Sequence, residues 1–229
     1  MEPLLFFLLG LPMTFAANQL IQRLTDYEED EDEAAEVGEQ ARIVAKSLPW
    51  HIGAWPDRVR LIAIVSIPFL SAVAGWRFEP VQAAAVSLLV WALVVCTATD
   101  LLRFRVPNAV TYPGVVLALA ATLLMPDADF VAAVAAAAIG GLCFLVMAII
   151  TRGGIGLGDV KLAVLIGAGL GFPAAYQALA LGIIAGGVVI LALFLAGVVG
   201  RRQAVPYAPF LALAAVVVVL TQGAAFAPL

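Results

Sequence analysis

Two aspartates at the edges of apolar runs are the side chains best suited to chemistry. Asp100 follows the apolar run 81–99, and Asp159 follows the glycine-rich stretch 153–158 and precedes another apolar run. A carboxyl group at a membrane boundary is costly to desolvate and tends to face a cavity or a partner. Two carboxyls in one cavity share a proton, because both cannot ionise easily. Such a pair can take a proton from water while its protonated member polarises a carbonyl, as an aspartyl protease requires.

Each aspartate also has a simpler interpretation. Asp159 could be the N-cap of a helix, and Asp100 could be a loop residue beside Arg103 and Arg105. The glycines next to Asp159 favour the catalytic interpretation. Because Gly156 and Gly158 lack a Cβ, they would let an extended substrate approach the acid and would permit a positive φ.

The composition indicates that these residues are held by membrane helices. The chain has 229 residues, of which 64% are apolar and 12% charged, and its mean hydropathy is +1.07. A soluble domain has roughly 25% charged residues. This much apolar surface requires lipid as the solvent. The net charge of −4 gives no support for a nucleic-acid partner.

Apolar runs predict an all-α polytopic membrane protein with about eight transmembrane helices. The runs are 3–22, 59–76, 81–99, 109–125, 130–150, 160–172, 174–199 and 206–221. The runs 160–172 and 206–221 fall short of the about 20 residues that a crossing helix needs. We expect the first run to be a retained helix rather than a signal peptide, because no basic residue precedes it.

The basic residues predict the orientation. If the segment 23–58 is cytoplasmic, 11 of the 12 Lys and Arg residues fall on the inner side and only Arg77 falls outside. This bias places both termini outside and both aspartates at the cytoplasmic face. The predicted domains are a first transmembrane helix at 1–22, a short acidic cytoplasmic loop at 23–58 and a membrane core at 59–229.

Three motifs in order resemble those of the type IV prepilin peptidase family. The first is Asp100 followed by Pro107, Asn108, Thr111 and Pro113; the second is Gly156, Gly158, Asp159 and Lys161 in the pattern GxGDxK; the third is the proline-rich segment 205–211. The resemblance implies that Asp100 and Asp159 are the catalytic pair of a membrane aspartyl protease. It also implies that Gly156, Gly158, Lys161, Pro107 and Asn108 bind substrate or support the site. Lys161 would position or tune the pair, although a contact with lipid phosphate is the simpler alternative.

The resemblance implies an endopeptidase that removes the basic leader of prepilin-like proteins at the cytoplasmic face of a bacterial inner membrane. Its partners would be that substrate and membrane lipid, and it would support assembly of a pilus or a type II secretion pseudopilus. We expect no cofactor, no metal and no nucleic acid, and the oligomeric state is left open.

The cysteines separate this chain from larger members of the family, which carry a four-cysteine zinc insertion and also methylate the new N-terminus. Here Cys96 and Cys143 both lie in apolar runs and form no CxxC pair. We therefore expect neither a zinc site nor methylation.

Two other functions fit parts of the sequence. A catalytically silent scaffold for pilus or secretion assembly would need no aspartates at these positions. A transporter is disfavoured, because no predicted span has a charged residue in its middle. The acidic loop has nine of the 16 acidic residues between 26 and 39. Its field could attract a basic leader, or it could be a solvated linker.

Overall fold

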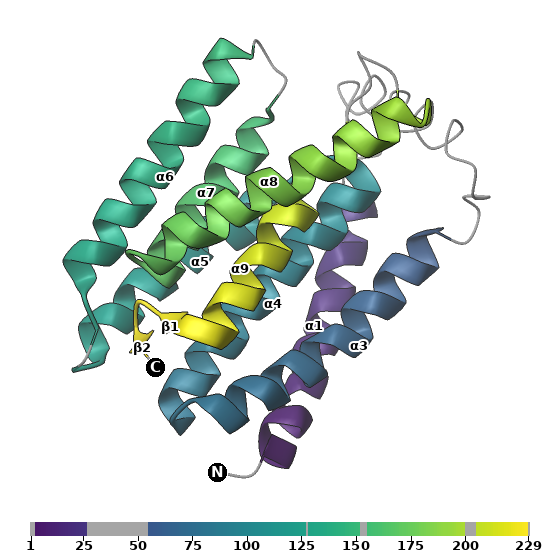
Figure 1. Cartoon of the computed structure of the whole chain (residues 1–229). Helices are drawn as coiled ribbons and strands as arrows, with labels where there is room; N and C mark the ends of the chain where they lie inside the picture. The colour runs from purple at the N-terminus through teal and green to yellow at the C-terminus, as the bar shows by residue number, and fades with distance from the viewer. Residues whose placement is uncertain (1–2, 27–54, 127, 152–154, 200–204, 229) are drawn as a thin grey trace.

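The chain is all-α, as the sequence predicts. The computed structural model describes residues 3–26, 55–126, 128–151, 155–199 and 205–228, and within them it contains eight helices and one short hairpin (Figure 1). The helices are α1 (Pro3–Asp26), α3 (Trp55–Arg77), α4 (Pro80–Arg103), α5 (Asn108–Leu124), α6 (Phe130–Ile150), α7 (Leu157–Leu170), α8 (Ala174–Leu195) and α9 (Ala208–Gln222). The hairpin pairs β1 (Gly223–Ala224) with β2 (Ala227–Pro228). Each predicted apolar run forms one helix.

The helices fall into two length classes. Helices α1, α3, α4, α6 and α8 are long and apolar enough to cross a membrane. Helices α5, α7 and α9 have 17, 14 and 15 residues. Gly156 caps the start of α7, and Gly171, with a φ of 64°, ends it. Most of the acidic loop, residues 27–54, lies outside the described residues.

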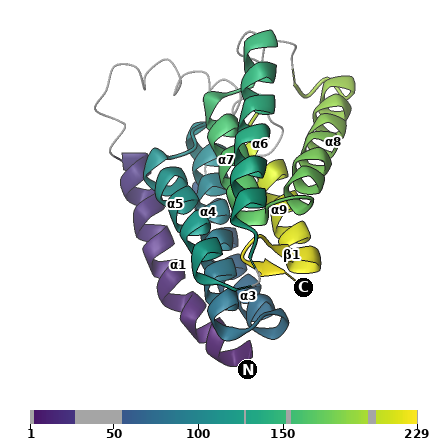
Figure 2. The same cartoon turned by 90° about the vertical axis from the view of Figure 1, so that its left-hand side faces the viewer.

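Helix α4 is central to the bundle. It packs against α1, α3, α5 and α9, while α7 packs against α5, α6, α8 and α9. Helices α1 and α3 therefore lie at one edge, and α6 lies at the other (Figure 1). In both views the start of α1 and the C-terminal hairpin lie toward the same end of the bundle (Figures 1 and 2). The end of α4 and the starts of α7 and α9 lie at the opposite end.

Small residues let the backbones of neighbouring helices come close. A Cβ added at Gly167 in α7 would lie 2.5 Å from Ala137 Cα and 2.6 Å from the Ala136 carbonyl carbon in α6. The same holds between α1 and α3, where a Cβ at Gly10 would lie 2.6 Å from Pro68 Cα. Close backbone approach favours helix association in lipid, where van der Waals packing is a main driving force.

Replacing Gly167 by alanine should destabilise the bundle. The added methyl meets backbone atoms of α6 that cannot move aside, so we expect a loss of about 1–3 kcal/mol in the free energy of unfolding. The matched control is Gly187→Ala in α8, where an added Cβ has no neighbour within 4 Å. That change should be neutral or stabilise by about 0.5–1 kcal/mol, since alanine is the better helix former. Thermal unfolding of both purified variants in detergent tests this, and equal midpoints would contradict the close packing of α6 and α7.

Candidate active site

Asp100 is held by the first turn of another helix. It lies in the last turn of α4 with 6% of its surface exposed, and its Oδ2 accepts a hydrogen bond of 3.0 Å from the backbone N–H of Ala208. Ala208 is the first residue of α9, where backbone N–H groups have no partner within the helix. Asp100 supplies that partner from 108 positions away in the chain. The interpretation of Asp100 as a loop residue is wrong, because α4 continues to Arg103.

Asp159 is held within its own helix. It is 8% exposed, and its Oδ2 accepts from the N–H of Gly156 at 3.3 Å while its own N–H donates to the Gly156 carbonyl at 3.1 Å. The N-cap of α7 is therefore Gly156, and Asp159 is the third helical residue. The simpler interpretation, in which Asp159 is the N-cap, is wrong for this reason.

Both carboxyl groups line one cavity of about 520 Å³ at the ends of the helices. The structure brings all seven predicted site residues to this cavity: Asp100, Asp159, Gly156, Gly158, Lys161, Pro107 and Asn108. Leu24 of α1 and the side chains of Arg103 and Arg105 also line it. The cavity thus joins the ends of α1 and α4 to the starts of α5 and α7, with two acids among several basic groups. The roles of the individual residues stay predictions.

Gly158 acts differently from the prediction. The positive-φ residues of the described chain are Phe104, Gly171, Gly197 and Gly223, so the expected positive φ at Gly156 and Gly158 is wrong. A Cβ at Gly158 would instead lie 3.1 Å from Val106 Cγ2, whereas one at Gly156 would make only ordinary contacts. Gly158 lets the connection between α4 and α5 approach the start of α7. That connection turns at Phe104, whose φ is 55°.

Lys161 links the first two motifs. Its Nζ donates to Asn108 Oδ1 at 2.6 Å and lies 5.8 Å from the centre of the Tyr112 ring. An ammonium over an aromatic face is a favourable cation–π arrangement. These contacts tie α7 to the first turns of α5, so they favour a positioning role for Lys161 over a contact with lipid phosphate.

Burial sets the electrostatics at the start of α7. Loss of water raises the pKa of the Asp159 carboxyl well above its ordinary range, and the hydrogen bond from Gly156 opposes this in part. Burial and the charge of Asp159 also raise the pKa of the nearby Tyr207 phenol. The charge of Asp159 also acts on Asp100 across the cavity.

The third motif contributes to the site in a way that the sequence does not reveal. Tyr207 and Ala208 bring the start of α9 to the two aspartates, and the Tyr207 hydroxyl donates to the Ile183 carbonyl of α8 at 3.0 Å. A Cβ at Gly186 of α8 would lie 2.7 Å from the Tyr207 ring, so the ring packs flush on that helix. The motif was recognised by resemblance, but a backbone donor carries no side-chain signal that could have assigned its role.

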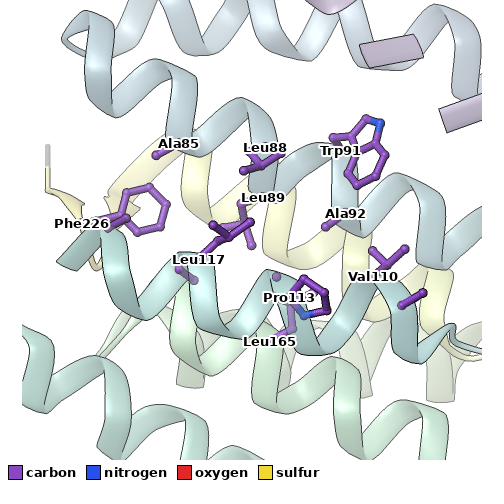
Figure 3. Close-up of a pocket in the computed structure, with 14 residues that line it drawn as sticks. Ala85, Leu88, Leu89, Trp91, Ala92, Val110, Pro113, Leu117, Leu165 and Phe226 are labelled. Atoms are coloured by element: carbon purple, nitrogen blue, oxygen red, sulfur yellow. The ribbon is translucent and has the colours of Figure 1, made fainter. Parts of the chain in front are cut away.

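A second cavity offers no chemistry. It has a volume of about 90 Å³ and lies between α4 and α5, with Leu165 and Phe226 among its lining residues. Figure 3 shows that Leu89, Leu117 and Phe226 point toward the same space. No ionisable residue lines it. Among the described residues, no group of three or more His, Cys, Asp or Glu side chains could hold a metal ion.

Comparisons with known proteins agree with the first two motifs. Residues 87–191, which contain both aspartates, match the model of the type IV leader peptidase family. The chain is 32% identical over 144 residues to a prepilin leader peptidase/N-methyltransferase of Bacillus subtilis (strain 168), covering 62% of this chain and 58% of that protein. It is 29% identical over 162 residues to a protein of the same description from Pseudomonas putida, covering 68% of this chain and 56% of that protein.

These matches confirm the resemblance to type IV prepilin peptidases. The chain spans less than two thirds of the length of these two relatives. No solved structure matches.

The raised pKa of Asp159 predicts how stability depends on pH. The fold favours the protonated carboxyl, so as pH rises above the ordinary aspartate value the unfolded chain ionises before the folded one does. The wild type should therefore lose stability between about pH 4 and neutral relative to Asp159→Asn, which cannot ionise. Thermal unfolding from pH 4 to 8 measures this difference.

The control is Glu79→Gln, because Glu79 is exposed and makes no side-chain cap at the start of α4. Its unfolding curve should follow the wild type at every pH. If the Asn variant were the less stable one at neutral pH, Asp159 would have to be an ion-paired carboxylate rather than a desolvated acid.

Proposed function

We propose that this protein is an aspartic endopeptidase that removes the basic leader peptide of prepilin-like proteins. The observation that carries the proposal is that two buried carboxyl groups, on different helices and 59 positions apart in the sequence, line one cavity with room for water and a peptide segment. The similarity of residues 87–191 to type IV leader peptidases supports this substrate class. Asp100 and Asp159 would share one proton, because both cannot ionise easily in the same cavity.

The proposed reaction is a general acid–base hydrolysis. The ionised carboxylate takes a proton from water, whose oxygen attacks the scissile carbonyl carbon, and the protonated carboxyl gives its proton to the carbonyl oxygen. The tetrahedral intermediate then breaks at the C–N bond as the leaving nitrogen accepts a proton. The N–H groups of Ala208 and Gly156 would hold the two carboxyls in place throughout.

We infer that the site faces the cytoplasm of a bacterial inner membrane and that both termini are external. The inference is supported by the distribution of Lys and Arg, of which only Arg77 would lie outside. The acidic loop would begin at the cavity, since Leu24 near the end of α1 lines it. Whether that loop attracts a basic leader or is only a solvated linker concerns residues outside the described part of the chain. We also propose that the protein supports assembly of a pilus or a type II secretion pseudopilus.

Loss of either carboxyl should abolish cleavage. Asp100→Asn and Asp159→Asn keep the side-chain size but remove the proton exchange, so we expect kcat for a candidate prepilin to fall by about 10³-fold or more. Cleavage is measured with purified enzyme and prepilin in liposomes, by the mass of the product. Unfolding midpoints of both variants show whether the fold is kept.

The matched control is Glu79→Gln, an exposed acid before the start of α4, at the other end from Asp100. It should cleave at the wild-type rate. Substantial cleavage by either aspartate variant would remove that residue from the mechanism. A wild-type protein that folds and binds prepilin without cutting it would instead support the alternative of a catalytically silent scaffold.

The product should keep an unmodified N-terminus. The chain has only two cysteines, of which Cys96 is buried, so the four-cysteine insertion of larger family members has no counterpart here. Mass spectrometry of the product after incubation with S-adenosylmethionine tests this. A mass increase of one methyl group with the purified protein would show that methylation does not depend on the zinc site.

A further inference from the structure

The start of α9 packs into a notch on α8. The two helices lie against each other (Figure 1), and the buried face of α8 carries two glycines about one turn apart, Gly182 and Gly186. A Cβ at Gly182 would lie 2.9 Å from Leu211 Cα, and one at Gly186 would lie 2.7 Å from the Tyr207 ring. Small residues let neighbouring helices approach closely in lipid. These two glycines therefore determine where the first turn of α9 lies.

The Tyr207 side chain adds a hydrogen bond to this contact. Its hydroxyl donates to the carbonyl of Ile183, which lies between the two glycines, at 3.0 Å. Burial and the charge of Asp159 raise the pKa of the phenol, so the hydroxyl stays protonated and remains a donor at neutral pH. The start of α9 is thus tied to α8 twice, by the packing of the ring and by the hydroxyl.

The same short segment carries the donors that face Asp100. Ala208 follows Tyr207 and donates its N–H to Asp100 Oδ2 at 3.0 Å, and the N–H of Tyr207 also acts on this carboxyl. Pro206 and Pro209 flank the two residues. Because proline fixes φ and has no N–H, the segment is stiff and its two remaining donors both serve Asp100. A shift of the Tyr207 ring on α8 must therefore shift these donors.

We propose that Tyr207 is a positioning residue for Asp100 and that it acts through the docking of its side chain on α8. The inference rests on the proposed function and adds to it a residue and a helix that do not touch the substrate. Tyr207 is absent from the lining of the cavity that holds the two acids, and its hydroxyl already donates to Ile183. It therefore acts through the Ala208 N–H. The alternative is a hydrogen bond that only joins two helices.

Removing the hydroxyl should slow cleavage without weakening substrate binding. For Tyr207→Phe we expect kcat for a prepilin to fall about ten- to a hundredfold with KM nearly unchanged, because a small displacement of a catalytic group has an effect of this order. The matched control is Trp91→Phe, which removes a 2.8 Å hydrogen bond from Trp91 Nε1 to the Met13 carbonyl and so also loosens two helices. It should lower the unfolding midpoint but keep the wild-type kcat. Equal losses of kcat in the two variants, or no loss in Tyr207→Phe, would overturn the proposal.

A methyl group in the notch should have the same effect. Gly186→Ala pushes on the Tyr207 ring, so we expect a similar loss of kcat, whereas Gly187→Ala has no neighbour within 4 Å and should keep the wild-type rate. Combined with Tyr207→Phe, Gly186→Ala should lose less than the product of the two single losses, because both changes act through one ring. Losses that multiply would contradict this shared route.

A measurement that needs no turnover separates this inference from the proposed function. Hydrogen–deuterium exchange of the segment 205–211 reports on the N–H groups of Tyr207 and Ala208. Exchange should be about tenfold faster in Tyr207→Phe and Gly186→Ala than in the wild type, and Asp100→Ala, which removes the acceptor, should show the same change. Unchanged exchange in Tyr207→Phe would mean that the donors keep their place without the hydroxyl, and the proposal would fail. If the wild type cleaves no prepilin, the proposed function fails, while exchange still decides whether Tyr207 holds the donors of Asp100.

Discussion

The hydrogen bond from the Ala208 N–H to Asp100 is the interaction on which the rest of the site depends. A carboxyl group buried at the end of an apolar bundle is costly unless donors face it. Helix α9 supplies a donor that its own first turn leaves unpaired, so one contact satisfies both an acid and a helix terminus. It also fixes the end of α4 against the start of α9. The other acid, Asp159, needs no distant partner, because it accepts from the N–H of Gly156, the N-cap of its own helix.

Packing of small residues brings the motifs to this contact. Gly158 lets Val106 reach the start of α7, Gly167 lets α7 lie against α6, and Gly186 lets α8 receive the ring of Tyr207. Each glycine removes side-chain bulk where two backbones or a backbone and a ring must approach. The positions of the two carboxyls therefore follow from helix spacing more than from local loop conformation. Lys161 adds a polar tie to Asn108 at the surface of the same junction.

Much of the fold could be predicted from hydropathy, because each apolar run forms one helix. Successive helices run in alternating directions, so the C-terminal end of α4 and the starts of α7 and α9 lie on the same side. The two aspartates were placed at that side for the same reason. Hydropathy does not state which helices are neighbours, so the contact between Asp100 and α9 could not be predicted. Backbone donors such as the Ala208 N–H have no residue signature. The expected φ at Gly158 was wrong because a glycine pattern does not distinguish backbone freedom from close packing.

The short length of α7 affects how water reaches the two aspartates. Its 14 residues span about 21 Å, less than a hydrocarbon layer of about 30 Å. Of the helices that pack against it, α6 and α8 have 21 and 22 residues, whereas α5 and α9 have 17 and 15. The cavity that holds the two acids lies at the start of α7, whose first turn lines it. For the proposed hydrolysis, this opening at the start of α7 would let water reach the two acids from the end of the bundle, while the longer helices α6 and α8 are long and apolar enough to cross the lipid.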